Sequence, residues 1–138
     1  MENLQKDFLH YELALKMKQL GFDEPCLGYW RNEDLPNPIT IGQYTTKEDI
    51  EYEISGQDEY HNFKNIIALA PLYQQAFRWF REKYGFFHYV TTHDSTDFEW
   101  YIYDKYQNDW EDDIVQNTYE EAELACLKKL IELSTETK

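Results

Sequence analysis

The chain has 138 residues, of which 42% are hydrophobic and 17% aromatic. This length and composition supply enough apolar surface for a core of ordinary size and exclude a chain disordered for lack of core material. The formal net charge of −14, from 27 acidic and 13 basic residues, disfavours direct DNA binding, because phosphate contacts require lysine and arginine.

The first predicted element is a helix over about residues 10–20. Gly21 follows it at the position where a left-handed residue commonly ends a helix, and Phe22 can close over Met17 in a Schellman-type cap. Residues 26–30 and 38–44 then predict two strands joined by the loop NEDLPN, which indicates a first β-hairpin.

Residues 45–70 leave two interpretations open. Residues 46–49 could start a helical turn, whereas Ile50, Tyr52 and Ile54 alternate like a strand. A second helix is predicted from Pro71, a favoured first residue of helices, to Tyr84, with Gly85 as the capping residue.

A second hairpin is predicted from residues 86–92 and 97–106, which flank the turn sequence HDST. Alternation in its second strand should turn Phe98, Trp100 and Ile102 to the core and the residues between them to water. The last predicted helix begins after Thr118, because Thr118 and Glu121 have the spacing of a capping box.

Runs of helix and hairpin predict an α+β fold, with three helices packed on one face of an antiparallel sheet built from hairpins. We expect one globular domain over residues 1–138, with short flexible tails at about 1–6 and 134–138. Cys26 and Cys126 are too few for a disulfide scaffold and are expected to be buried free thiols. No run reaches membrane-spanning length, so we expect a cytoplasmic protein without a membrane partner.

The motifs of common catalytic and cofactor sites are absent, including GxGxxG, the P-loop, HExxH and GxSxG. We therefore expect no enzyme, no catalytic residues and no cofactor. The best metal candidate is the acidic loop 109–113 with Glu120, which resembles a calcium loop. It carries Ile114 where such a loop requires glycine, so no dedicated metal site is expected.

Two surfaces are candidates for binding. The first is the outer side of the second hairpin with the adjoining acidic loop, because tyrosine and tryptophan beside polar groups are typical of protein interfaces. Its residues are Glu99, Tyr101, Tyr103, Trp110, Glu111, Asp112 and Asp113. Alternatively, a loop or the 45–70 segment covers these rings. The second is a basic helix face with Arg78 and Arg81 three residues apart, which neighbouring acids could instead neutralise.

Three blocks carry a resemblance. They resemble small proteins of Bacteroides-type bacteria and their phages and prophages. The blocks are YExA (11–14) with LGFDEPC (20–26), APLYQQAFRWFREKYG (70–85) and YEEAELACLKKLI (119–131). That family has no assigned catalytic residues, so none are transferred. The resemblance implies a phage accessory protein of the anti-CRISPR kind, a class that binds and disables host defence proteins.

The leading hypothesis is therefore an acidic inhibitor that binds a basic nucleic-acid-handling host protein, such as a CRISPR effector nuclease, in the bacterial cytoplasm. Electrostatic attraction would steer a chain of charge −14 towards such a partner. The alternatives are a structural or scaffolding protein that acts as a homodimer or larger homo-oligomer, and a metal-dependent enzyme with a carboxylate site. RNA binding through Arg78 and Arg81 is disfavoured by the surrounding negative charge.

Overall fold

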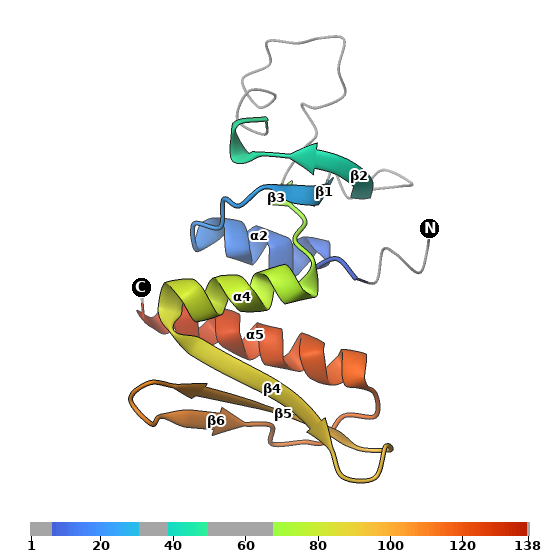
Figure 1. The fold of residues 1–138 in the computed structure, drawn as a ribbon, viewed down its shortest axis with the longest axis vertical. Helices are drawn as coiled ribbons and strands as arrows, with labels where there is room; N and C mark the ends of the chain where they lie inside the picture. Colours follow the sequence, from blue (N-terminus) through green and yellow to red (C-terminus); the bar gives the residue numbers. More distant parts are fainter. Residues whose placement is uncertain (1–6, 31–38, 50–67, 138) are drawn as a thin grey trace. The chain divides into compact units, whose positions relative to one another are not determined.

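The computed structural model describes residues 7–30, 39–49 and 68–137, and the chain divides into two compact units, residues 1–73 and 74–138 (Figure 1). The expectation of a single domain over residues 1–138 stays a prediction. The N-terminal tail predicted at residues 1–6 lies outside the described residues.

The first unit combines one helix with a three-stranded antiparallel sheet. Its described elements are α2 (Tyr11–Gln19), β1 (Cys26–Trp30), β2 (Ile39–Thr45) and β3 (Ala68–Leu69). The strand order is β2-β1-β3, and both pairings are antiparallel. The first predicted hairpin is thus confirmed as β1–β2. The short strand β3 adds a third strand, brought in from far along the chain.

The end of α2 has the predicted cap. Gly21 has a φ of 100°, which glycine adopts without the steric cost that a Cβ atom would bring. The Phe22 N–H donates to the Met17 carbonyl at 2.9 Å, and the Gly21 N–H donates to the Lys18 carbonyl at 3.0 Å. These two bonds define a Schellman motif and satisfy carbonyls that the helix end leaves open.

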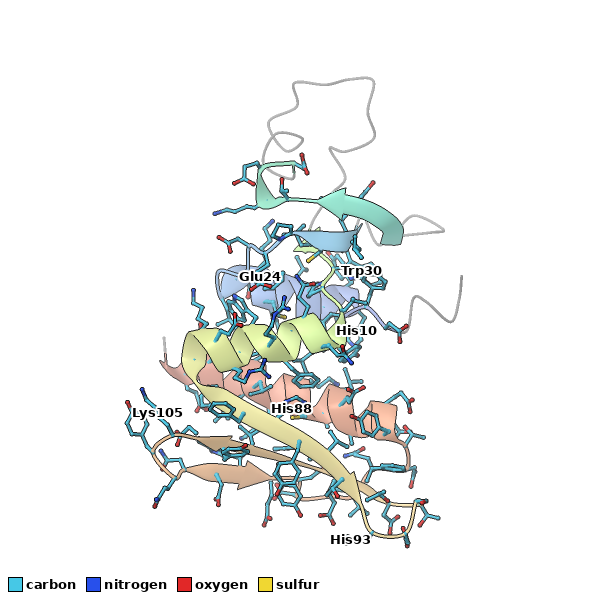
Figure 2. The ribbon with its side chains drawn as sticks, viewed as in Figure 1. His10, Glu24, Trp30, His88, His93 and Lys105 are labelled. Atoms are coloured by element: carbon cyan, nitrogen blue, oxygen red, sulfur yellow. The ribbon has the colours of Figure 1, made fainter. Side chains whose placement is uncertain are left out.

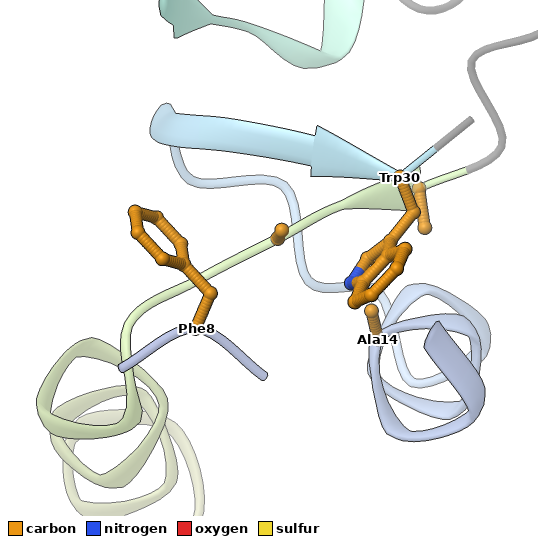
Figure 3. Packing of buried hydrophobic residues seen from close by; sticks show 5 residues of the cluster. Phe8, Ala14 and Trp30 are labelled. Carbon is orange, nitrogen blue, oxygen red and sulfur yellow. The ribbon is translucent and has the colours of Figure 1, made fainter. Parts of the chain in front are cut away.

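The core of the first unit gathers around Trp30. Phe8, Ala14, Ala68 and Ala70 pack with it in one buried cluster, and the indole ring points towards Ala14 on α2 (Figure 3). Trp30 Nε1 donates a buried hydrogen bond of 2.7 Å to the carbonyl of Leu9. The indole therefore ties the end of β1 to the segment before α2 by both apolar contact and a directional bond.

Pro71 lies before the second helix instead of starting it, which corrects the prediction. The helix α4 spans Tyr73–Tyr84. The Pro71 carbonyl accepts the Leu9 N–H at 2.8 Å, and the Tyr73 N–H donates to the Asp7 carbonyl at 3.1 Å. The chain stays extended there because its backbone groups pair with residues 7–9, which a local helix signal cannot reveal.

The second unit also combines helices with a three-stranded antiparallel sheet. Its strands are β4 (Phe86–Thr92), β5 (Phe98–Asp104) and β6 (Asp109–Glu111), in the order β4-β5-β6, and α5 spans Tyr119–Thr137. α5 packs against β4 and β5 (Figure 1). The second hairpin and the α+β class are confirmed, with the described strands forming two sheets.

The ends of the helices in this unit follow local rules. Gly85 has a φ of 73°, and its N–H donates to the Arg81 carbonyl at 3.1 Å, as in the simpler left-handed cap. At the start of α5, the Thr118 hydroxyl accepts the Glu121 N–H at 3.1 Å, as the capping box predicts. The helix continues to Thr137 with Ser134 fully buried, so the tail predicted from residue 134 is corrected.

The segment 45–70 is described at its two ends only. Thr46 and Asp49 exchange side-chain and backbone hydrogen bonds, and a helical turn begins directly after Thr46. Residues 50–67, where a strand was the alternative, lie outside the described residues. Cys26 and Cys126 are buried and form no disulfide, as predicted. In the described part of the chain, no helix is long and apolar enough to cross a membrane.

Candidate functional site

The sheet of the second unit has two chemically different faces. Residues of alternating position on each strand point to opposite faces. One face carries the buried side chains of Phe86, Trp100 and Ile102. The other face, called the outer face below, carries Phe87, Tyr89 and Thr91 on β4, Glu99, Tyr101 and Tyr103 on β5, and Asp109 and Glu111 on β6.

Two rows of side chains cross the outer face from β4 to β6. The strand register places Tyr89 opposite Tyr101 and Tyr101 opposite Glu111. The Tyr89 and Tyr101 rings are stacked, with centroids 4.8 Å apart and planes 19° apart. This first row is therefore an aromatic pair that ends in a carboxylate.

The second row repeats this pattern two residues further along the sheet. Phe87 lies opposite Tyr103, and Tyr103 lies opposite Asp109. The Phe87 and Tyr103 rings are stacked, with centroids 5.4 Å apart and planes 17° apart. The Tyr89 ring also lies next to the Tyr103 ring, with centroids 6.4 Å apart, so the two rows form one continuous aromatic surface.

Glu99 holds the Tyr101 ring in place. The Tyr101 hydroxyl donates to Glu99 Oε2 at 2.6 Å. This hydrogen bond, with smaller contributions from desolvation and from the nearby negative charges, raises the pKa of Tyr101 to about 12. Tyr101 is therefore a neutral phenol at pH 7, and all of the formal charge on the outer face comes from carboxylates.

Two of the four aromatic side chains of the outer face are exposed to solvent, and the other two, Phe87 and Tyr101, are half-buried. Tyr89 is 48% exposed and Tyr103 is 44% exposed. None of the strand positions of this face holds a lysine or arginine, whereas three hold a carboxylate. Exposed rings beside carboxylates, without an internal counter-charge, can bind a partner that brings apolar surface and positive charge.

The structure separates Trp110 from the tyrosines with which it was grouped. Residues 109–111 form the strand β6, so the predicted acidic loop is in part a strand. Trp110 lies opposite the buried Ile102 and packs edge-on against Phe86, with ring centroids 5.8 Å apart. Strand alternation thus turns Trp110 to the inner face and leaves Asp109 and Glu111 on the outer face.

The two acids that follow β6 have different surroundings. Asp112 is half-buried: its backbone N–H donates to the Trp100 carbonyl, and its carboxylate accepts bonds from the Ile114 N–H and the Gln116 side chain. Asp112 therefore shapes the turn before α5, whereas Asp113 is exposed. Among the described residues, no group of three or more histidine, cysteine or acidic side chains is placed to hold a metal ion.

The predicted basic face is exposed on α4 at Arg78 and Arg81. The His88 ring is stacked on the Phe77 ring, with centroids 3.7 Å apart, and is close enough to Arg81 to experience its positive charge. Burial, and secondly the positive charge of Arg81, lower the pKa of His88 from 6.5 to about 4. His88 is therefore a neutral, half-buried ring at pH 7.

The ends of the second sheet are marked by two polar residues. Figure 2 shows His93 at the tip of the β4–β5 hairpin and Lys105 at the other end, where β5 turns towards β6. The Lys105 ammonium lies 5.2 Å from the centre of the Tyr106 ring. Both residues lie beyond the strands, and the second row, at Phe87, Tyr103 and Asp109, lies nearer to the Lys105 end.

Phe87 and Tyr89 were missed as site residues. In β4 both alternating sets contain aromatic rings, so the pattern alone does not say which set faces outward. The usable signal lies in the neighbouring strand. The clear alternation of β5 sets the outer face at Tyr101 and Tyr103, and hairpin pairing then assigns Tyr89 and Phe87 to that face.

Comparison of the chain with protein-family models, with curated proteins and with solved structures finds no match. The functional interpretation therefore depends on the chemistry of the described surface.

Proposed function

We propose that this chain is a non-catalytic binding protein that uses the outer face to contact a basic surface of a partner protein. The observation that carries the proposal is the pair of rows, each a stacked aromatic pair with one exposed tyrosine that ends in a carboxylate. Exposed tyrosines bury much area at a small entropic cost when they bind, and for this reason they are frequent anchors of interfaces.

The charge of the whole chain favours the same kind of partner. A net charge of −14 attracts a basic protein over a distance and speeds its association. The carboxylates of the outer face would then orient the complex, because like charges on the partner would be repelled there.

The partner that we propose is a nucleic-acid-handling protein of the bacterial host, such as a CRISPR effector nuclease. Such proteins present basic channels that hold nucleic acid, and an acidic chain seated there would block access. Support comes from the acidic outer face and from the resemblance to phage and prophage proteins stated above. The chain would then act as an inhibitor by direct binding.

The test is an affinity pull-down of the tagged chain from nuclease-treated host lysate, in parallel with a variant that combines Tyr103→Ser with Glu111→Gln. The control variant combines Tyr106→Ser with Glu136→Gln, which changes an exposed tyrosine and an exposed carboxylate elsewhere in the same unit. We expect a nucleic-acid-handling protein to be retained by the wild type and the control and to be lost with the outer-face variant.

The retained protein is then purified and assayed for nucleic-acid binding or cleavage with increasing amounts of the chain. Inhibition at stoichiometric amounts supports the inhibitor. If all three forms retain the same proteins, the outer face is not the binding surface. If the wild type retains only itself and its mass rises with concentration, the homo-oligomeric alternative replaces the proposal.

A further inference from the structure

We propose that the outer face recognises an extended, arginine-rich segment of the partner, whose alternate arginines stack on the two aromatic pairs and pair with the carboxylates that end the rows. This inference rests on the proposed function and specifies the chemistry that the surface recognises. Three features support it: the spacing of the rows, the order of groups within each row and the charges of the face.

The spacing of the rows matches an extended chain. Tyr101 and Tyr103 are two residues apart on one strand, and so are Tyr89 and Phe87. Two residues of a strand span roughly 6.6 Å, and an extended peptide places its side chains on one side with the same period. Residues i and i+2 of a bound segment that runs along β5 would therefore each meet one row.

The order of groups within a row suits a guanidinium group. Neighbouring strands are about 4.8 Å apart, so each carboxylate on β6 lies one strand away from the tyrosine ring on β5. Arginine is planar, stacks on aromatic faces and offers several N–H donors in its plane to a carboxylate. Lysine carries a compact, strongly hydrated charge and matches a ring beside a carboxylate less well.

The outer face is prepared for such a ligand before it binds. The bond from Tyr101 to Glu99 holds the central ring, and ring stacking holds Tyr89 and Phe87 against their partners. Little side-chain freedom therefore remains to be lost on binding. The strand positions of the face hold three carboxylates and no lysine or arginine, so the face itself is negatively charged.

The same features disfavour other occupants of this surface. The carboxylates repel the phosphates of a nucleic acid. A second copy of the chain would bring an identical set of carboxylates against the first, at a net charge of −14 for each copy. A basic peptide segment is the ligand class that satisfies both the rings and the charges.

The experiment measures binding of fluorescent peptides to the full chain by anisotropy at two salt concentrations. The first peptide alternates arginine with threonine (RTRTR). Three further peptides change one property each: lysine replaces arginine, neutral citrulline replaces arginine, or the same residues are reordered so that no two arginines are two residues apart (RRTTR). We expect the alternating arginine peptide to bind about tenfold tighter than the citrulline peptide and several-fold tighter than the lysine and reordered peptides.

Variants locate the binding site on the chain. Tyr101→Leu and Glu111→Gln should each lower the affinity for the alternating arginine peptide several-fold. The first removes a stacking surface and the second removes a carboxylate. The matched controls Tyr106→Leu and Glu136→Gln should leave its affinity unchanged. Circular dichroism and urea midpoints show whether each variant is folded. If Tyr101→Leu does not fold, Tyr103→Leu replaces it in the test.

Equal affinity for arginine, lysine and reordered peptides would overturn the inference, as would outer-face variants that bind like the wild type. If the pull-down partner depends on the outer face but no arginine peptide binds, the inference fails and the proposed function stands. If the partner also binds the outer-face variants as tightly as the wild type, both the inference and the proposed function fail.

Discussion

The Tyr101 hydroxyl donates a hydrogen bond of 2.6 Å to Glu99 Oε2, two residues away on the same face of β5. The bond joins the central ring of the outer face to a carboxylate of its own strand. It orients the Tyr101 ring before any ligand arrives and keeps the phenol neutral, because losing its proton would place two negative charges side by side.

Replacing Glu99 should change the titration of Tyr101. In Glu99→Gln we expect the pKa of Tyr101 to fall from about 12 towards the ordinary value of 10, because the charged acceptor that favours the protonated phenol is gone. NMR of chain labelled at the tyrosine rings follows the titration, and Tyr101→Phe identifies the signal. A Tyr101 titration that is the same in Glu99→Gln and the wild type would contradict the role assigned to this bond.

Stability should fall at mildly acidic pH because of His88. Its folded-state pKa of about 4 lies below the ordinary value of 6.5, so the unfolded chain takes up a proton first. The free energy of unfolding is therefore undiminished above pH 6.5 and decreases as pH drops from 6.5 towards 4. Because the ring is only half-buried, we expect His88 to contribute a loss of about 1–2 kcal/mol between pH 7.5 and pH 5.

Urea unfolding at both pH values measures this loss. His88→Phe keeps a ring against Phe77 without a titrating group, so its stability should depend less on pH in this range. His93→Gln is the matched control, because His93 is exposed at the hairpin tip. If His88→Phe loses as much stability as the wild type between the two pH values, His88 is not the cause.

Gly85 should tolerate asparagine better than alanine. Apart from Gly85 itself and its chain neighbours, no atom lies within 4 Å of a Cβ atom built at this position, so its space is open. The φ of 73°, however, is unfavourable for residues with a side chain. We expect Gly85→Ala to lower the free energy of unfolding by about 1 kcal/mol and Gly85→Asn by less, since asparagine visits this region more readily. Equal losses in urea unfolding would show that backbone strain is not the cause.

The buried tryptophans Trp30 and Trp100 provide a matched test of one hydrogen bond. Trp30 Nε1 donates to the Leu9 carbonyl, whereas Trp100 Nε1 is buried with no hydrogen-bond partner among the residues that the structure describes. Each Trp→Phe change removes a similar volume. We expect Trp30→Phe to cost about 1–2 kcal/mol more than Trp100→Phe, because only the former leaves a carbonyl without its donor.

Denaturant unfolding followed by circular dichroism measures both losses, and a separate transition for each unit would be fitted separately. A Trp100→Phe loss as large as that of Trp30→Phe would mean that ring packing alone sets the cost at both sites.

The features that sequence predicted correctly depend on residues close together in the chain. The caps at Gly21 and Thr118 follow from steric and hydrogen-bonding preferences within one helical turn. Both hairpins follow from polar turns between apolar runs. The alternation of β5 placed Tyr101 and Tyr103 on the outer face, and the register confirms that placement.

The features that sequence missed depend on pairing between distant segments. Pro71 carries a helix-start signal, yet backbone bonds to residues 7–9 keep its segment extended. Trp110 in an acidic stretch suggested an exposed loop, yet pairing with β5 makes the stretch a strand and turns the indole inward. Neither pairing has a local signature in the sequence.

The sequence by itself thus determined the acidic charge, the α+β class and the outward tyrosines of β5, because composition and short-range periodicity encode them. Only the tertiary structure decided that Tyr89 and Phe87 stack on those tyrosines and that Asp109 and Glu111 end the two rows. Strand register aligns residues on three separate strands, and the period-two alternation of each strand fixes its own faces but not its neighbours' alignment.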